Sequence, residues 1–335
     1  MGVKNIAVVG FGQIGKRHVE VIEKNSKLQI HSIVDNEPNK IAKLKYPSYL
    51  SLNELLESDE DLPDLISVCT PNYLHLDNAE QIVSKGIKLL IEKPLAIEYS
   101  DASRFNDKWG KNGQAFTVTQ NRYSPTIQLL KDIIEQGKIG TVTNIQVNCF
   151  WNRNKAYYKE SNWKGSIEKD GGVLFTQFSH FIDLLVWLFG GIQALYSRTE
   201  NYLHRQITEF DDSGIIAFTT SEGALGSIHY STAAFQKNME SRIVLLGTEG
   251  SICIAGQYMN EIAWVSPVSL SENVHNQANS SNNYGNYQGS AANHHLLYED
   301  LANNWNQPEK ITTSNIEDAA KVVEFIEQVH KLADQ

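Results

Sequence analysis

Three closely spaced glycines near the start of the chain constrain its fold more than any other feature. Gly10, Gly12 and Gly15 follow the first apolar run and stand directly before sequence with helical spacing. In a strand–turn–helix unit the first glycine permits a tight turn, the second lets backbone N–H groups approach a pyrophosphate, and the third lets helix and strand pack closely. The pattern favours dinucleotide binding over its alternative, a purely structural turn.

The first third of the chain alternates apolar runs of strand length with segments of helical spacing, as in parallel βαβ units. The predicted strands are residues 5–9, 29–34, 65–69, 88–91 and 115–119. The predicted helices are residues 18–24, 74–85 and 101–111, and Pro38 suits the first turn of a short helix. We therefore expect a parallel sheet that is buried on both faces.

After residue 120 the pattern changes, and 335 residues are enough for two domains. A helix over residues 125–136 precedes a series of predicted strands, which are residues 142–150, 214–219, 226–230, 243–246, 251–254 and 261–265. Residues 272–293, rich in Asn, Ser and Gly, predict a long loop, and residues 316–332 predict an amphipathic helix. We expect an α/β fold in which residues 1–120 bind a dinucleotide. Residues 121–335 would form an α+β domain on a large, mostly antiparallel open sheet, for substrate binding and oligomerisation.

Asp35 ends the second predicted strand, twenty residues past Gly15. A carboxylate at this position can accept hydrogen bonds from the adenosine ribose hydroxyls and would repel a 2′-phosphate. The next residues, Asn36 and Glu37, offer no arginine to bind such a phosphate. The sequence therefore favours NAD over NADP, although an ordinary strand-end Asp is the alternative.

Polar residues also follow the third and fourth predicted strands, where ligands of open parallel sheets bind. The third strand leads into Thr70, Asn72 and His75, and the fourth into Glu92 and Lys93. Lys93 could bind a sugar hydroxyl and accept its proton if burial and the positive nicotinamide lowered its pKa. The alternative is a solvated lysine on a loop.

Together, the glycine motif, the Cys69-Thr70-Pro71-Asn72 segment and the Glu92-Lys93-Pro94 segment resemble the Gfo/Idh/MocA oxidoreductase family. The likeness spans essentially the whole chain. It implies a Rossmann domain, an α/β domain with an open sheet, hydride transfer from a sugar or polyol carbon to NAD, and homodimers or homotetramers packed through that sheet. It implies these cofactor contacts: Gly10, Phe11, Gly12, Gln13, Ile14, Asp35, Thr70, Asn72, His75, Glu92, Lys93 and Gln120.

A second segment, residues 170–183, matches the glycine-pair helix of that family, whose histidine lies by the substrate carbinol. That histidine is His180 here, and Asp183 at i+3 shares its helix face and could orient the imidazole. Many polyol-oxidising members carry Asp four residues before the histidine, whereas this chain has Thr176. The resemblance therefore leaves Lys93 and His180 as the catalytic candidates.

Other segments resemble the branch of the family that acts on nucleotide sugars in bacterial polysaccharide (lipopolysaccharide) biosynthesis. The resemblance implies oxidation of the C3 hydroxyl of a UDP-linked N-acetylated sugar uronic acid to the 3-keto sugar, with 2-oxoglutarate as a candidate reoxidant. Cations and aromatic rings in these segments suit a carboxylate, a diphosphate and a sugar, although half of them could be structural. The implied substrate contacts are Lys93, Asn121, Arg122, Tyr123, Arg153, Tyr158, Trp163, Lys164, Thr176, Gln177, His180 and His295.

Composition narrows the remaining function classes. A formal charge of −10 and the absence of a Lys/Arg-rich block disfavour nucleic acid. Three widely spaced cysteines disfavour disulfides and a thiolate zinc site, which fits a reducing cytoplasm, and His294 beside His295 is poor support for any metal. The most apolar later stretch, residues 181–190, is too short for a membrane span and carries Asp183. The rival functions are a dehydrogenase of a free sugar or inositol and a non-catalytic NAD-binding sensor.

Overall fold

The computed structural model describes residues 2–58, 61–271, 281–283, 288–311 and 313–335. The chain divides into two compact units. The first comprises Met1–Thr119 and His294–Ala320, and the second comprises Gln120–Asn293 and Lys321–Gln335. All residues after 120 were predicted to form the second domain, whereas the segment His294–Ala320 packs in the first unit.

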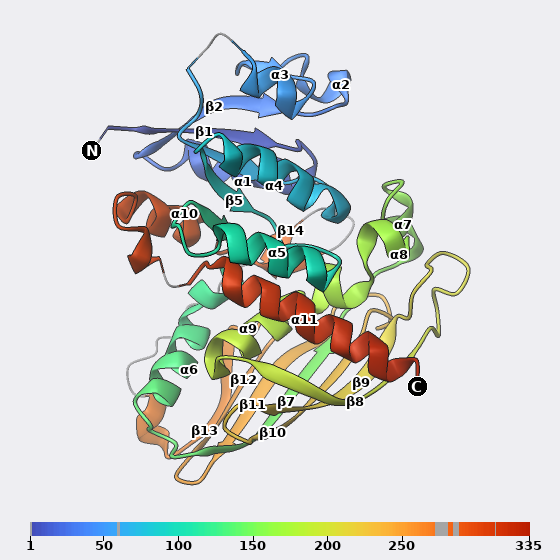
Figure 1. The fold of residues 1–335 in the computed structure, drawn as a ribbon. Helices are drawn as coiled ribbons and strands as arrows, with labels where there is room; N and C mark the ends of the chain where they lie inside the picture. Colours follow the sequence, from blue (N-terminus) through green and yellow to red (C-terminus); the bar gives the residue numbers. More distant parts are fainter. Residues whose placement is uncertain (1, 59–60, 272–280, 284–287, 312) are drawn as a thin grey trace. The chain divides into compact units, whose positions relative to one another are not determined.

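The first unit is built on a six-stranded parallel sheet in the order β3-β2-β1-β4-β5-β6. Its central strands have nearly every residue buried, which confirms the predicted Rossmann sheet. Figure 1 shows α1, α4 and α5 along this sheet. The elements are β1 (Lys4–Val9), α1 (Gln13–Glu23), β2 (Leu28–Val34), α2 (Pro38–Ile41), β3 (Ser48–Tyr49), α3 (Leu52–Leu56), β4 (Leu65–Val68), α4 (His75–Ser84), β5 (Lys88–Ile91), α5 (Tyr99–Trp109), β6 (Ala115–Thr117) and α10 (His294–Asn303).

The second unit is built on a seven-stranded sheet in the order β13-β12-β11-β7-β10-β9-β8. Only the β10–β7 pair is parallel, so the predicted mostly antiparallel sheet is confirmed. Figure 1 shows α6 and α9 on one face of this sheet. The elements are α6 (Pro125–Glu135), β7 (Val142–Phe150), α7 (Lys155–Lys159), α8 (Ile167–Asp170), α9 (Ser179–Phe189), β8 (Ile192–Glu200), β9 (Ser213–Thr220), β10 (Leu225–Ser231), β11 (Glu240–Gly247), β12 (Ser251–Ala255), β13 (Glu261–Ser266), β14 (Ser281–Asn283) and β15 (Gln288–Ala291). The long helix α11 (Ile316–Ala333) begins in the first unit and ends in the second.

The predicted loop 272–293 is partly wrong. Strands β14 and β15 pair antiparallel within it. The pairing uses backbone hydrogen bonds, which the polar composition of the segment does not predict. Residues 272–280 and 284–287 of that prediction lie outside the described residues.

One apolar helical stretch, Ile167–Phe189, is long and apolar enough to cross a bilayer. However, 83% of its apolar window is buried inside the structure, as in a core helix.

Candidate functional site

The glycine loop between β1 and α1 has the shape of a phosphate cradle. Gly10 has a φ of +94°, and a Cβ there would lie 2.6 Å from the carbonyl oxygen of Cys69. A Cβ at Gly15 would collide with the carbonyl oxygen of Gly10, whereas a Cβ at Gly12 would meet nothing within 4 Å. Gly12 is also the N-cap of α1, whose first turn directs N–H groups into that open space. The loop therefore fits a pyrophosphate, with Phe11, Gln13 and Ile14 supplying backbone at its rim.

The Asp35 carboxylate is held in place at the end of β2. Its Oδ2 accepts the Phe11 N–H at 2.7 Å, and its Oδ1 accepts the Glu37 N–H at 2.9 Å. Each oxygen keeps capacity to accept a ribose hydroxyl. Lys40, which the sequence analysis did not consider, lies 3.7 Å from Oδ1 and 2.6 Å from Glu37 Oε1.

The loops after β4 and β5 are tied together by His75. Its Nδ1 lies 2.6 Å from the Pro94 carbonyl oxygen and its Nε2 lies 2.9 Å from the Thr70 carbonyl oxygen. Burial lowers the pKa of His75. Because the neutral ring carries one N–H, this predicted cofactor ligand donates to one of the two carbonyl oxygens, and the shorter contact favours Pro94, on the loop that carries the half-buried Lys93. Asn72, also a predicted cofactor contact, is buried at the start of the same loop region.

Glu92 lies in a buried cluster that the sequence did not reveal. Its Oε1 lies 3.1 Å from His18 Nε2 and 3.7 Å from His294 Nε2, and its Oε2 accepts the Lys93 N–H at 3.1 Å. On its other side, His18 Nδ1 lies 2.8 Å from the Ser67 and Tyr298 hydroxyls. The ligand atoms of His18, Glu92 and His294 all lie within 4.8 Å of one another, which is spacing that a metal ion could use. The prediction that the chain has no metal site therefore stays untested for this cluster.

In the second unit, the predicted catalytic histidine follows an irregular helix. Residues Leu174–Phe178 form a π-helix directly before α9, and the buried His180 is the second residue of α9. π-Helical turns occur frequently at functional sites. Thr176, within this turn, donates a hydrogen bond to Asp170, which also accepts the Gly165 N–H at 2.9 Å. Asp170 thus holds the residue that replaces the family's aspartate.

Arg122 and Asp183 form an ion pair that the sequence did not reveal. From the sequence, Arg122 is predicted to bind substrate and Asp183 to orient His180, and both roles stay predictions. Arg122 is fully buried, and its Nε donates to Asp183 Oδ2 at 2.9 Å. Its guanidinium also lies 5.5 Å from the Trp187 ring centroid. A buried bidentate ion pair of this kind fixes α9 to the segment before α6.

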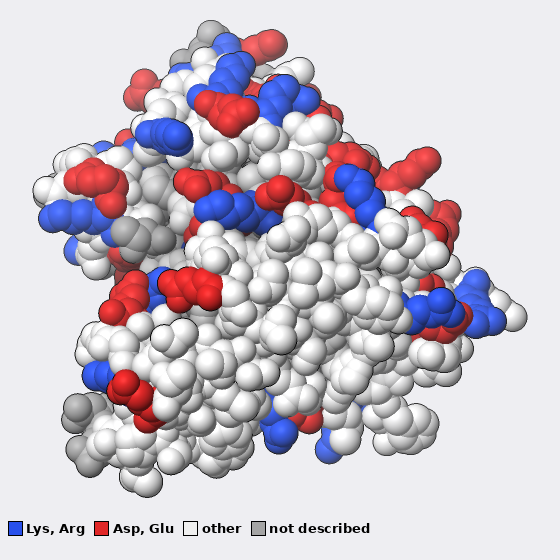
Figure 2. Space-filling view, turned by 60° about the horizontal axis from the view of Figure 1, so that its bottom comes forward, with Lys and Arg blue, Asp and Glu red and all other residues white. Residues whose placement is uncertain are grey.

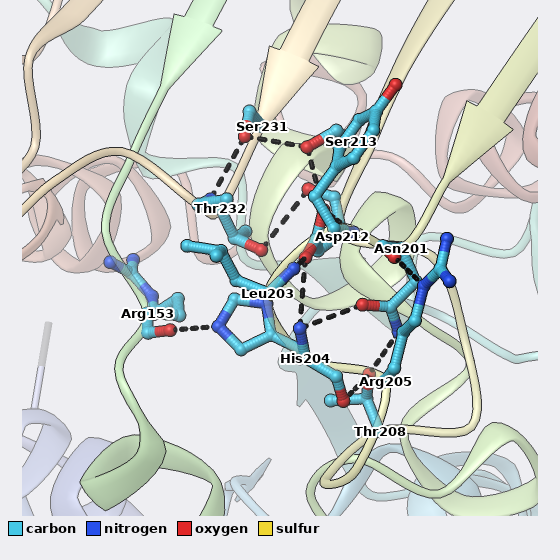
Figure 3. A network of polar contacts seen from close by, with 12 residues as sticks. Arg153, Asn201, Leu203, His204, Arg205, Thr208, Asp212, Ser213, Ser231 and Thr232 are labelled. Carbon is cyan, nitrogen blue, oxygen red and sulfur yellow. Dashed lines mark hydrogen bonds and ion pairs between the residues drawn. The ribbon is translucent and has the colours of Figure 1, made fainter.

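Arg153 lies in a second buried polar network. Its Nε donates to Gln177 Oε1 at 2.7 Å, and Gln177 Nε2 donates to the Tyr157 hydroxyl at 2.7 Å. Figure 3 shows His204 between Asp212 and the Arg153 backbone, with His204 Nδ1 3.0 Å from Asp212 Oδ2 and Nε2 2.7 Å from the Arg153 carbonyl oxygen. Although burial opposes ionisation, hydrogen bonds from His204 and nearby groups lower the pKa of Asp212 to about 2. The Arg153 main chain is therefore firmly positioned.

Aromatic rings and a second cation adjoin this network. The Arg153 guanidinium lies 5.0 Å from the Trp151 ring centroid, and Lys164 Nζ lies 4.0 Å from the Tyr157 ring centroid. Burial lowers the pKa of Lys164, although the nearby Glu160 opposes this. Tyr158 packs on His204 with ring centroids 5.2 Å apart. The structure thus brings together Arg153, Tyr158, Lys164 and Gln177, and it adds Tyr157 and Trp151, which were not among the predicted contacts.

The remaining predicted contacts are distributed as follows. Asn121 is buried and its Oδ1 has no hydrogen-bond partner among the described residues, so it can still accept a ligand's donor. Gln120 donates to Ser290 Oγ at 2.9 Å while its Oε1 is likewise unpaired in the described part of the chain. Tyr123 and Trp163 are half-buried. His295 is exposed on α10, in the first unit.

Two solved structures resemble the whole chain. The WlbA dehydrogenase from Bordetella pertussis, in complex with NADH and UDP-GlcNAcA, superposes with a TM-score of 0.86 and 26% identity over 99% of this chain and 96% of that one. The WlbA dehydrogenase from Chromobacterium violaceum, with the same ligands, gives 0.86 and 27% over 100% and 94%. These neighbours were crystallised with NADH, and the glycine loop fits the same cofactor, so this protein is an NAD-binding oxidoreductase.

Sequence comparison points to the same class. The chain is 26% identical over 194 residues to the glucose-6-phosphate 3-dehydrogenase of Bacillus subtilis, which covers 56% of this chain and 54% of that protein. It spans 61% and 58% of two oxidoreductases without an assigned activity. The family models match on both sides of residue 120: "Oxidoreductase family, NAD-binding Rossmann fold" over residues 4–120, and "GFO/IDH/MocA C-terminal domain" over residues 127–253. Since these matches cover most of the chain, the protein belongs to the Gfo/Idh/MocA family of oxidoreductases.

Proposed function

We propose that this enzyme oxidises the C3 hydroxyl of a UDP-linked N-acetylated sugar uronic acid to the 3-keto sugar. The observation that carries the proposal is the full-length similarity to two dehydrogenases whose structures hold NADH and UDP-GlcNAcA. The chemistry of the second unit supports it, because Arg153 and Lys164 beside Tyr157 are suited to an anionic sugar. The unpaired Asn121 Oδ1 offers an acceptor for a sugar hydroxyl or amide.

In the proposed mechanism, bound NAD supplies the hydride acceptor. Gly12 and the first turn of α1 hold the pyrophosphate through backbone N–H groups, and Asp35 accepts hydrogen bonds from the ribose. Lys93, through its neutral Nζ, or His180, through a ring nitrogen, accepts the proton of the C3 hydroxyl. Thr176, Gln177 and Arg153 bind and orient the sugar.

The proposal extends to the protein's setting. We place the enzyme in the cytoplasm, in bacterial polysaccharide biosynthesis, with 2-oxoglutarate as reoxidant of the reduced cofactor. The three cysteines are buried free thiols, which suits a reducing compartment. We further propose a homodimer or homotetramer formed through the seven-stranded sheet.

Substrate comparison tests the proposal directly. Purified protein with NAD would be given UDP-GlcNAcA, UDP-GlcNAc, glucose 6-phosphate, myo-inositol and free glucose, each with and without 2-oxoglutarate. We expect UDP-GlcNAcA to be oxidised fastest, with a C3 ketone identified by NMR. Faster oxidation of a free sugar would favour the first rival. If no compound gave reduced nicotinamide, even in a single turnover, the result would favour the second rival, a non-catalytic NAD-binding sensor.

A further inference from the structure

The main chain of Lys93 is fixed from two sides by buried histidines. On the carboxyl side, His75 Nδ1 lies 2.6 Å from the Pro94 carbonyl oxygen. On the amino side, Glu92 Oε2 accepts the Lys93 N–H at 3.1 Å, and Glu92 Oε1 lies 3.1 Å from His18 Nε2. Residues 92–94 therefore cannot shift without breaking contacts to α1 or α4.

The amino-side contact involves an unusual concentration of ionisable groups. His18 is 0% exposed, Glu92 6% and His294 1%. Around them, the other titratable side chains facing His18 are Tyr298 on α10, with ring centroids 5.5 Å apart, and Cys69 after β4. Arg17, on α1, is a charged neighbour of His294, which is the first residue of α10. An isolated charge in such a place would be costly, so the charges have to compensate one another.

The protonation states are mutually consistent. Burial alone would lower the pKa of His18, but Cys69, Tyr298 and the Glu92 carboxylate together raise it well above its usual value. Burial would raise the pKa of Glu92, but hydrogen bonding to His18 and His294 holds it well below its usual value. Burial lowers the pKa of His294, so that ring is neutral at pH 7. The 3.1 Å contact between His18 Nε2 and Glu92 Oε1, with each pKa shifted toward the charged form, favours a cation on His18 and an anion on Glu92.

We infer that His18 and Glu92 form a buried ion pair that positions the Lys93 main chain for proton transfer, with Ser67 and Tyr298 orienting the imidazole. His18 and Glu92 are positioning residues, and the inference rests on the proposed role of Lys93. Glu92 therefore acts through the protein rather than as the cofactor ligand that the sequence suggested. The alternative occupant of the cluster, a divalent metal ion, would take the place of the proton on His18 Nε2.

The ion pair predicts a direction for the pH dependence. Because the folded-state pKa of His18 is raised, the stabilisation from the pair is fully present below the imidazole's unfolded value. It is lost as the pH rises through the folded value. Hydride transfer should consequently decline at alkaline pH in the wild type, through loss of Lys93 positioning, with little loss of NAD affinity.

Variants of Glu92 separate positioning from general stability. Glu92→Ala removes the acceptor for the Lys93 N–H and should slow single-turnover hydride transfer on the order of 100-fold, since a small misplacement has an effect of that size. Glu92→Gln keeps an acceptor and should recover much of that loss, with its pH profile altered because the charge is gone. His31→Gln, a half-buried histidine on β2, is the matched control and should leave rate and profile unchanged. Equal rates for Glu92→Ala and the wild type would overturn the inference.

A second measurement does not need turnover. The ¹⁵N shifts of histidine-labelled protein at pH 8, assigned with His18→Gln, should show a cationic His18 and a neutral His294. A neutral His18, or one equivalent of zinc found by elemental analysis of protein purified without chelators, would overturn the inference. If the wild type oxidises no sugar, the proposed function fails, while the state of His18 still decides whether the ion pair exists.

Discussion

At the scale of single residues, Lys93 is one of the two candidates for the base. It follows β5 and is half-buried, with its backbone fixed by Glu92 and by the His75 contact to Pro94. Lys93→Ala should therefore leave the dissociation constant of NAD nearly unchanged, because the phosphate cradle lies in another loop. Hydride transfer should slow by about 10²- to 10⁴-fold, the usual contribution of a general base. Fluorescence titration with NADH and stopped-flow absorbance measure the two quantities.

A matched lysine controls for the loss of positive charge. Lys85 is exposed at the end of α4, and Lys85→Ala should change neither quantity. A Lys93→Ala enzyme with the wild-type rate would remove Lys93 from the mechanism and leave His180 as the base.

Single residues also show where sequence reasoning ended. The spacing in the sequence was enough to predict the roles of Gly10, Gly15 and Asp35, because the geometry of a phosphate-binding turn is local. The contacts of His18 were invisible, since its partner Tyr298 is 280 positions away in the chain. Likewise, nothing in the sequence indicated the ion pair between Arg122 and Asp183.

At the scale of elements, the glycine loop allows two substitutions with opposite expected outcomes. Gly12→Ala places a methyl group in the open cradle, and the φ of −74° at this position suits alanine. Its melting temperature should change little, but its NAD affinity should fall at least about tenfold, or roughly 1.4 kcal/mol. Gly15→Ala forces a methyl group against the Gly10 carbonyl and should destabilise the fold by about 1–3 kcal/mol.

Thermal unfolding and NADH titration of both variants test this division. Unchanged NAD affinity in Gly12→Ala would mean that the cofactor phosphates do not lie over this glycine. A stable Gly15→Ala would mean that helix α1 can move away from β1 at little cost.

The elements themselves were predictable where their pattern was regular. Strand β7 has the predicted bounds, and its apolar residues alternate from Ile145 to Cys149. The helix from Pro125 differs from the prediction by a single residue, because helical spacing persists over its length. Strand β8 was missed because its pairing shifts register between Ala194 and Tyr196, which breaks the period of two. The π-helix before His180 was also missed, since its sequence has ordinary helical spacing.

At the scale of the whole molecule, the division of the chain into two units could be predicted only in part. Before residue 120 the predicted strands alternate with helices, and after it most strands follow one another directly. This change predicts the domain boundary, because the first pattern is typical of a parallel sheet and the second of an antiparallel one. The structure places the segment His294–Ala320 in the first compact unit, whereas the prediction placed it in the second domain. Its local sequence predicts helices but does not say on which unit they pack.

The seven-stranded sheet has one face without a helix in Figure 1. Leu225 pairs with Asn144, which pairs with Leu246 on its other side, so these side chains share a face. Leu225 is 60% exposed, Leu246 40% and Trp264 45%. Figure 2, which brings this end of the molecule forward, shows a broad area with few charged side chains. Monomeric proteins rarely leave such a surface in water.

If copies of the chain associate through this face, a charge placed on it should separate them. Leu225→Lys should convert the assembly to a monomer in light scattering after gel filtration, because a buried lysine without a partner is strongly disfavoured. Leu62→Lys, at an exposed position in the first unit, is the control and should leave the mass unchanged. A wild-type protein that runs as a monomer would refute assembly through this face. An assembly that survives Leu225→Lys would have to be held together by another surface.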